Sequence, residues 1–348
     1  MIKSQFVSKD DKIAAFDPNG PAASDNLYGL PFSYAESETI VLPVPWEATV
    51  SYRTGTSKAP EAIKRASAQV DLFDPLLKDA WKRGIYMVEV DSELEDKAKE
   101  TRLWTEEYLE GADTKTDGED LLHKINQSSQ EMIRWVKEHA IALLDDGKRV
   151  ALLGGDHSTP EGFLQALAAR HEDFGILQVD AHADLRQAYE GFEHSHASIM
   201  FNALKLPQVS VLTQVGVRDY CDEEHERIVN EQRVHCFFDQ NLKFEQFEGS
   251  TWHQQCERIV ATLPEKVYLS FDIDGLKPYL CPNTGTPVAG GLEIEEVLYL
   301  LKFLVASGRR LIGLDLNEVT PAKEGDWDAN VGARLLYRLC NLMALSQE

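Results

Sequence analysis

The pattern of hydrophobic and polar positions along the chain switches repeatedly between two forms. Short apolar runs rich in β-branched residues have the length and composition of strands that are buried on both faces. These runs are residues 38–44, 84–90, 149–153, 174–180, 211–217, 234–238, 266–272 and 310–316. Between them, apolar residues recur at helical spacing in residues 128–148, 161–171 and 293–308. This order predicts an α/β fold of three layers, with helices on both faces of a mostly parallel sheet of roughly eight strands.

One segment interrupts this pattern. Residues 91–120 are strongly acidic and poor in apolar side chains. Such a composition is typical of a solvated helix followed by a loop, or of a partly disordered excursion between two strands. We therefore predict a single domain over residues 1–348 with an acidic insertion at 91–120, which we expect to affect the rim of a pocket or a subunit contact.

The composition limits the class of partner. Hydrophobic residues make up 43% of the chain and charged residues 27%, as in soluble globular proteins. The net charge of −23 would repel nucleic acids and anionic membranes but attract a cationic small molecule. The five cysteines are dispersed without a Cys-x-x-Cys pair, which argues against a disulfide framework or a thiolate zinc site. The sequence shows neither a bilayer-spanning apolar run nor the apolar core of a signal peptide, so we expect a cytoplasmic protein.

Polar side chains gather directly after three of the predicted strands. Residues 154–158 read Gly-Gly-Asp-His-Ser, residues 180–184 read Asp-Ala-His-Ala-Asp, and residues 272–274 read Asp-Ile-Asp. In an extended backbone, residues two apart point to the same side, so the polar residues of each cluster would converge. Parallel sheets bind ligands beyond the carboxyl ends of their strands, which is where these clusters lie.

The clusters together predict a metal site. Each alone could be an ordinary hydrogen-bonded strand end or turn, but like charges packed this closely are costly unless cations neutralise them. Two imidazoles and four carboxylates without a thiolate favour Mn²⁺, with Fe²⁺, Co²⁺ or Ni²⁺ as alternatives, and disfavour structural zinc. Six ligands suit two ions roughly 3.5–4 Å apart that activate hydroxide. The predicted ligands are His157, Asp180, His182, Asp184, Asp272 and Asp274.

These motifs, in this order, resemble the three signature motifs of the ureohydrolases, the family of arginase and agmatinase. The third motif reads Ser-Phe-Asp-Ile-Asp-Gly in full, at residues 270–275. Further similarity, closest to agmatinase-like members, lies in residues 43–67, 184–198, 283–292 and 313–321. The resemblance extends over about residues 38–345, apart from the acidic insertion, and it implies the arginase-like fold.

The resemblance implies a role for each matching residue. One Mn²⁺ would be held by His157, Asp180, Asp184 and Asp272, and the second by His182, Asp180, Asp272 and Asp274. Asp184 would also orient the attacking hydroxide, and Glu318 would bind the planar guanidinium. Thr286 would line the same pocket. His196 would bind substrate and pass a proton to the departing amine, a role that suits a side chain with a pKa near neutrality. His194, two residues away, remains an alternative for this role.

The chain departs from the family pattern in the loop after the third motif. Lys277 stands where the family has an acid before Pro278, and Cys281 replaces a more usual hydroxyl residue. Neither change removes a predicted ligand. A lysine cannot accept the hydrogen bonds of a carboxylate, however, so the conformation of this loop cannot be carried over from the family.

The expected function is hydrolysis of a guanidino compound to urea and an amine by a binuclear manganese centre. Agmatine is the first candidate substrate, and aminopropylagmatine, guanidinobutyrate, guanidine and arginine are alternatives within the class. A metal-dependent deacetylase, with a single zinc ion, and a non-catalytic homologue are the rivals outside it. The resemblance also implies a homo-oligomer, either a trimer or a hexamer.

Overall fold

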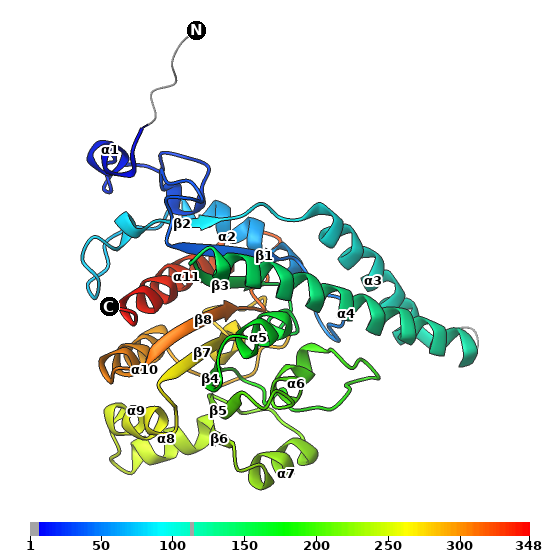
Figure 1. The fold of residues 1–348 in the computed structure, drawn as a ribbon. Helices are drawn as coiled ribbons and strands as arrows, with labels where there is room; N and C mark the ends of the chain where they lie inside the picture. Colours follow the sequence, from blue (N-terminus) through cyan, green and yellow to red (C-terminus); the bar gives the residue numbers. More distant parts are fainter. Residues whose placement is uncertain (1–6, 112–114) are drawn as a thin grey trace.

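The computed structural model of the protein describes residues 7–111 and 115–348, and an eight-stranded sheet forms its centre (Figure 1). The strands are β1 Thr39–Val44, β2 Ile85–Met87, β3 Arg149–Gly154, β4 Phe174–Val179, β5 Val209–Val215, β6 Val234–Phe237, β7 Lys266–Phe271 and β8 Arg310–Leu316. Their spatial order is β2-β1-β3-β8-β7-β4-β5-β6, and neighbouring strands are parallel. The predicted α/β fold with a parallel sheet is confirmed.

Each strand coincides with one of the eight apolar runs, because helices cover both faces of the sheet; every side chain of β1 and β4 is buried, while most of those of the edge strand β6 are partly or fully exposed. β2 is shorter than predicted and lies at the edge of the sheet. The helices are α1 Lys9–Ala15, α2 Ala59–Ser67, α3 Ser92–Gly111, α4 Lys115–Asp145, α5 Glu161–Ala168, α6 Ile199–Ala203, α7 Asp222–Asn230, α8 Asp239–Phe247, α9 Trp252–Ala261, α10 Ile294–Ala306 and α11 Trp327–Leu345.

Two hydrophobic cores separate the helices from the sheet. The first joins one face of the sheet to α2, α9, α10 and α11, with Ile63, Ile259 and Leu336 fully or almost fully buried. The second joins the other face to α4, α5 and α6, with Val136 and Phe163 fully buried. The sheet is therefore the middle of three layers, and the polar clusters at its carboxyl edge lie outside both cores.

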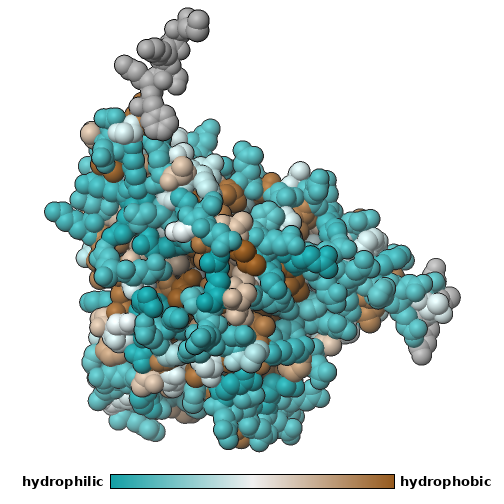
Figure 2. Space-filling model, in the orientation of Figure 1, coloured by the Kyte–Doolittle hydropathy of each residue, from teal (hydrophilic) through white to brown (hydrophobic). Residues whose placement is uncertain are grey.

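The acidic insertion is more regular than predicted. It begins with α3, but the expected loop is wrong for residues 115–120, which form the first turns of a long α4; residues 112–114 lie outside the described part. α4 therefore starts well before the predicted helix at 128–148, because Leu121 and Ile125 continue its buried stripe. We call residues 92–111 and 115–127 the arm. It projects from the body (Figure 1) with a mostly hydrophilic surface (Figure 2).

Two points of organisation follow from the described residues. All eight strands belong to one sheet, while the assignment of residues 1–348 to one domain stays a prediction. Within residues 7–111 and 115–348, none of the helices combines the length and the apolar character that crossing a membrane requires.

Candidate active site

The carboxyl ends of β3, β4 and β7 bring all six predicted ligands into one cluster. The Nδ1 atom of His157 lies 3.0 Å from Asp180 Oδ2, 3.0 Å from Asp184 Oδ2 and 3.4 Å from Asp272 Oδ2. The Nδ1 atom of His182 lies 3.0 Å from Asp274 Oδ2 and 3.6 Å from Asp180 Oδ1. Two groups of ligand atoms result, each spanning at most 4.8 Å, and Asp180 belongs to both.

The ligands converge through loops rather than through continued strands. β4 ends at Val179, and Asp184 adopts a left-handed backbone conformation with φ 54°, so the expectation that an extended strand aligns residues 180–184 was wrong. The backbone oxygen of Asp184 accepts hydrogen bonds from Met200 N at 3.1 Å and Phe201 N at 3.2 Å, which hold this conformation. Asp272 likewise leaves its strand and accepts a hydrogen bond from the Asp274 backbone at 2.8 Å.

A buried chain of hydrogen bonds orients the ring of His157. Its Nε2 atom lies 2.8 Å from Ser270 Oγ, which in turn donates to Asp315 Oδ1 at 3.2 Å. This arrangement gives the Nε2 proton a hydrogen-bond acceptor and directs Nδ1 at the carboxylates, which outweigh the effect of burial and raise the pKa of His157 well above its usual range while no cation is bound. Nδ1 is fully buried and finds no hydrogen-bond partner among the described residues. A buried imidazole nitrogen facing three carboxylates can exchange its proton for a cation, so the side chains present fit a divalent metal.

A second buried chain fixes Asp180. Gln178 Nε2 donates to Asp180 Oδ2 at 2.8 Å, and Gln178 Oε1 accepts from Gln214 Nε2 at 2.6 Å. Both glutamines are fully buried. The amide chain holds the carboxylate that the two ligand groups share, and it lies on the neighbouring strands β4 and β5. Such outer contacts orient metal ligands and raise metal affinity.

The charges of the cluster are unfavourable without a cation. Burial, and then the nearby Asp180 carboxylate, raise the pKa of Asp184 to about 7. Burial also raises the pKa of Asp272 well above its usual range, with a further contribution from Asp274. Burial opposes the charge of His182, but Asp274 and Asp180 outweigh it and raise its pKa to about 12. Without a cation, bound protons therefore offset the negative charge of the clustered carboxylates. A divalent cation would replace these protons.

A cavity of about 170 Å³ opens above the cluster and is lined by Glu318, Thr286 and His196 among others. Glu318 has a left-handed backbone with φ 63°, and its Oε1 accepts a hydrogen bond from the His157 backbone at 2.9 Å. Burial raises the pKa of Glu318 well above its usual range, with a contribution from Asp156 beneath it. Thr286 Oγ1 lies 3.4 Å from Asp274 Oδ2. The cavity thus has a buried carboxyl group facing the predicted metal cluster.

The two candidate histidines point in different directions. His196, at the start of a 3₁₀ turn, lines the cavity, and its ring lies edge-on to Tyr189 with centroids 6.2 Å apart. Desolvation, then the charges of His182 and His157, lower the pKa of His196 to about 4, so its imidazole is neutral at pH 7. His194 instead points to Glu161, with Nδ1 2.9 Å from Oε2.

Replacement of these histidines should therefore have unequal effects. We expect His196→Ala to lower turnover by about a hundredfold or more, the usual contribution of a positioned proton donor or acceptor. His194→Ala should lower it much less, since His194 only holds the loop to Glu161. Steady-state kinetics with metal content measured on the same samples checks this. Equal losses, or a loss of metal in His196→Ala, would contradict the placement of His196 as a proton-transfer group.

Sequence reasoning missed several residues of the cavity wall. Arg186, Tyr189, Asp219 and Glu224 line the cavity, and Glu224 is buried. Glu224 accepts hydrogen bonds from the backbone of Leu185 and Cys221, both at 3.0 Å, which ties the loop after β4 to the loop after β5. Asp219 and Glu224 follow the carboxyl end of β5. Ligands bind beyond the carboxyl ends of parallel strands, so polar residues after β5 were a signal that could have identified them.

Lys277 does not face the predicted metal cluster. Its Nζ pairs with Glu293 Oε1 at 2.6 Å, and its backbone nitrogen donates to Leu292 O at 3.0 Å. Glu293 is the N-cap residue of α10. Lys277 therefore has an acidic partner on the next segment, and this ion pair ties the loop after the third motif to the start of α10.

Comparison with known proteins shows the family of the chain. The model of the Arginase family matches residues 37–341. The chain belongs to the arginase family. The N(1)-aminopropylagmatine ureohydrolase of Synechocystis sp. is 30% identical over 90% of this chain and 92% of its own length. The agmatinase of Bacillus anthracis is 28% identical over 88% of this chain and 91% of its own length.

The fold agrees as well. The crystal structure of agmatine ureohydrolase of Thermoplasma volcanium superposes with a TM-score of 0.70 at 23% identity, covering 97% of this chain and 98% of that chain. The arginase-like fold predicted from the motifs is therefore confirmed. Membership of the arginase family also confirms the resemblance to the ureohydrolases, and with it the enzyme class of hydrolases that act on C–N bonds.

Proposed function

We propose that this arginase-family protein hydrolyses a cationic guanidino compound to urea and an amine, with agmatine as the first candidate substrate. The observation that carries the proposal is the placement of Glu318. Its buried carboxyl group lines the same small cavity as the predicted ligands His157, His182, Asp184 and Asp272. A guanidinium bound there would lie against both the carboxylate and the predicted metal cluster.

Five of the six predicted ligands form the two groups of ligand atoms, and Asp184 lies beside His157. Together they would hold two divalent ions, with Mn²⁺ favoured by their imidazole and carboxylate groups. When bound, such ions lower the pKa of water and so supply hydroxide at neutral pH. Asp180 supports this arrangement because it is shared by the two ligand groups. Asp184 would hold the attacking oxygen, since its carboxylate lies at the floor of the cavity beside His157.

The remaining residues would bind the substrate and move the proton. Glu318 would form charge-assisted hydrogen bonds with the guanidinium, and the substrate cation would offset the burial that raises the pKa of this carboxyl group. His196 is neutral at pH 7, so it can accept a proton and then donate it to the leaving amine. Thr286 would contact the substrate from the opposite loop.

The tail of the substrate is the finer part of the proposal. The exposed Asp219 and the buried Glu224 favour a cationic tail, while Arg186 on the same wall is paired with Glu224 at 3.6 Å. Agmatine, with a single amine on its tail, fits a wall that carries two acidic side chains and one arginine. The relative from Synechocystis sp. makes aminopropylagmatine the second candidate, since it is 30% identical to this chain. Both compounds share the guanidinium that Glu318 would bind.

The test is urea release by Mn²⁺-loaded protein from agmatine, aminopropylagmatine, guanidinobutyrate, arginine and guanidine, with Ni²⁺-loaded protein in parallel. We expect turnover of agmatine or aminopropylagmatine well above that of the other compounds. The matched control is Glu318→Gln, which keeps the shape of the side chain and removes its charge. Its kcat/KM should fall by at least about a hundredfold, because the charged hydrogen bonds to the guanidinium are lost. No urea from any compound with two ions bound would overturn the proposal.

Two further expectations belong to the same proposal. The family resemblance supports a homo-oligomer, a trimer or a hexamer, and light scattering on the loaded protein would measure its mass. The five dispersed cysteines, none of them in a disulfide, support a reducing and therefore cytoplasmic location.

A further inference from the structure

The arm reaches one wall of the active site through a loop that we call the His196 loop, residues 185–198. This loop leads from the predicted ligand Asp184 to His196 and carries Tyr189 on the cavity wall. The arm includes most of the predicted acidic insertion, residues 91–120, and the predicted metal ligands all lie outside it. Its contacts with the His196 loop nevertheless lie only three to five residues before the histidine.

Asn126 on α4 makes the central contact. Its Nδ2 donates to the backbone oxygen of Gly191 at 3.2 Å, and its Oδ1 accepts from the backbone nitrogen of Glu193 at 2.9 Å. One amide side chain therefore satisfies a donor and an acceptor of the same loop. Because the Asn126 amide both donates and accepts, it fixes which loop residues lie opposite it as well as their distance from α4.

Packing of the arm against the His196 loop reinforces the two hydrogen bonds of Asn126. A β-carbon on Gly191 would lie 2.9 Å from Leu122 Cδ2 of the arm, and the residue has φ 90°, so the loop backbone lies directly against α4 at a position that requires glycine. The ring of Phe192, which is fully buried, lies edge-on to Tyr108 of α3 with centroids 5.5 Å apart. Both helices of the arm thus contact the His196 loop.

The body of the protein holds the opposite side of the same peptide segment. Asn202 Nδ2 donates to Glu193 O at 2.9 Å and to Glu161 Oε2 at 3.1 Å. The same Glu161 oxygen lies 2.9 Å from His194 Nδ1. Glu193 is therefore held by its nitrogen from the arm and by its oxygen from the body. Removal of the arm contact would leave the loop fixed on one side only.

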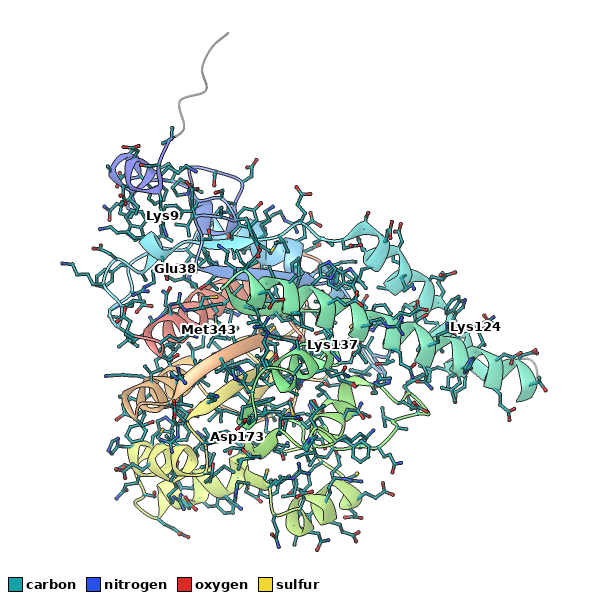
Figure 3. All side chains as sticks on the ribbon, viewed as in Figure 1. Lys9, Glu38, Lys124, Lys137, Asp173 and Met343 are labelled. Carbon is teal, nitrogen blue, oxygen red and sulfur yellow. The ribbon has the colours of Figure 1, made fainter. Side chains whose placement is uncertain are left out.

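The arm is itself braced, so it can act as a fixed support. Lys97 of α3 pairs with Glu131 of α4, and the Nζ of Lys124 lies 5.8 Å from the centre of the Trp104 ring (Figure 3 labels Lys124). Arg102 Nη1 donates to the backbone oxygen of Val50 at 2.5 Å, next to Ser51 on another part of the cavity wall. The arm therefore connects two segments of that wall.

We infer that the arm is a positioning element of the active site and that Asn126 is the positioning residue through which it holds the His196 loop. The inference rests on the proposed function only for the role of His196 in turnover. The position of the loop is a separate, physical property. Misplacement of a reacting group by about an ångström costs up to about a hundredfold in rate, so a contact remote from the predicted metals can matter.

Hydrogen–deuterium exchange of the loaded full-length protein tests the loop directly. The variants are Asn126→Ala, which removes both hydrogen bonds, and Asn126→Asp, which keeps only the acceptor for Glu193. Gln127→Ala is the matched control, because Gln127 is the exposed neighbour whose side chain points to Glu131. We expect peptides covering residues 186–198 to exchange at least about fivefold faster in Asn126→Ala, with a smaller change in Asn126→Asp and none in Gln127→Ala.

Kinetics on the same variants tests the consequence. Asn126→Ala should lower kcat by about tenfold in the native background and by less than about twofold in the His196→Ala background, since the loop then carries no proton-transfer group. Unchanged exchange in residues 186–198 would overturn the inference. Equal rate losses in both backgrounds would also overturn it, because they would place the effect of Asn126 elsewhere. If the native protein releases no urea from any compound, the proposed function fails, but the exchange result still decides the inference.

Discussion

Replacement of Asp180 by asparagine is expected to remove both bound metal and activity. Asp180 is fully buried, and it is shared by the two groups of ligand atoms: its Oδ2 lies 3.0 Å from His157 Nδ1 and its Oδ1 3.6 Å from His182 Nδ1. Asparagine has the same shape but lacks the negative charge that both ions would require. Without hydroxide generation at neutral pH, turnover should fall by at least about a thousandfold.

The measurement is metal content per subunit after dialysis, together with urea release. Asp173→Asn is the matched control, because Asp173 is an exposed aspartate at the opposite end of the same strand, just before β4 (labelled in Figure 3). It should bind two ions and keep full activity. Asp180→Ala tests whether any residual metal depends on the remaining amide oxygen. If Asp180→Asn retained two tightly bound ions, the assignment of Asp180 as a shared ligand would be wrong.

The sequence was sufficient to predict the sheet, because a parallel strand buried on both faces leaves a plain apolar run. The eight runs became eight strands, each within a few residues of its predicted bounds. The helices were predicted less fully. α11 packs its apolar residues around most of its circumference, so the stripe that marks an amphipathic helix is weak. The order of the strands in space depends on contacts between distant segments, which periodicity does not encode.

In the active site, too, the identity of the residues could be predicted from the sequence, but their geometry could not. The residues of the cluster could be named from three strand ends, since the carboxyl edge of a parallel sheet gathers them. Their geometry could not, because it depends on the left-handed backbone of Asp184 and of Glu318, which tertiary contacts impose on non-glycine residues. Ser270 and Gln178 lie inside strands that read as ordinary apolar runs. Their role in orienting His157 and Asp180 is visible only once the strands are placed side by side.

Metal removal is expected to lower the melting temperature, and to lower it more at pH 8 than at pH 6. Two ions at about a hundred times their dissociation constants would each stabilise the fold by about 2.7 kcal/mol. For a chain of this size, their loss corresponds to a decrease of about 5–10 °C. The pH dependence follows from the protons that the cluster takes up when it holds no cation.

In the metal-free protein, the pKa of Asp184 is raised to about 7 and that of His182 to about 12, both above their values of 3.8 and 6.5 in the unfolded chain. A raised pKa contributes stability that is present at low pH and is lost as the pH rises through the folded-state value. The metal-free fold should therefore become less stable between pH 6 and pH 8. Loaded protein holds these ligands deprotonated, so its stability should not fall in the same way.

Calorimetry on loaded protein, and on protein stripped by a chelator that is then removed, measures this difference at each pH. Groups remote from the cluster titrate alike in both samples, so the difference between their melting temperatures isolates the cluster and the cavity side chains that respond to its charge, such as His196. Asp180→Asn provides a further control, because a site that binds no metal should show almost no difference at either pH. A difference that is constant or smaller at pH 8 would mean that protons do not occupy Asp184 and His182 in the metal-free state, and the electrostatic argument for two cations would lose its basis.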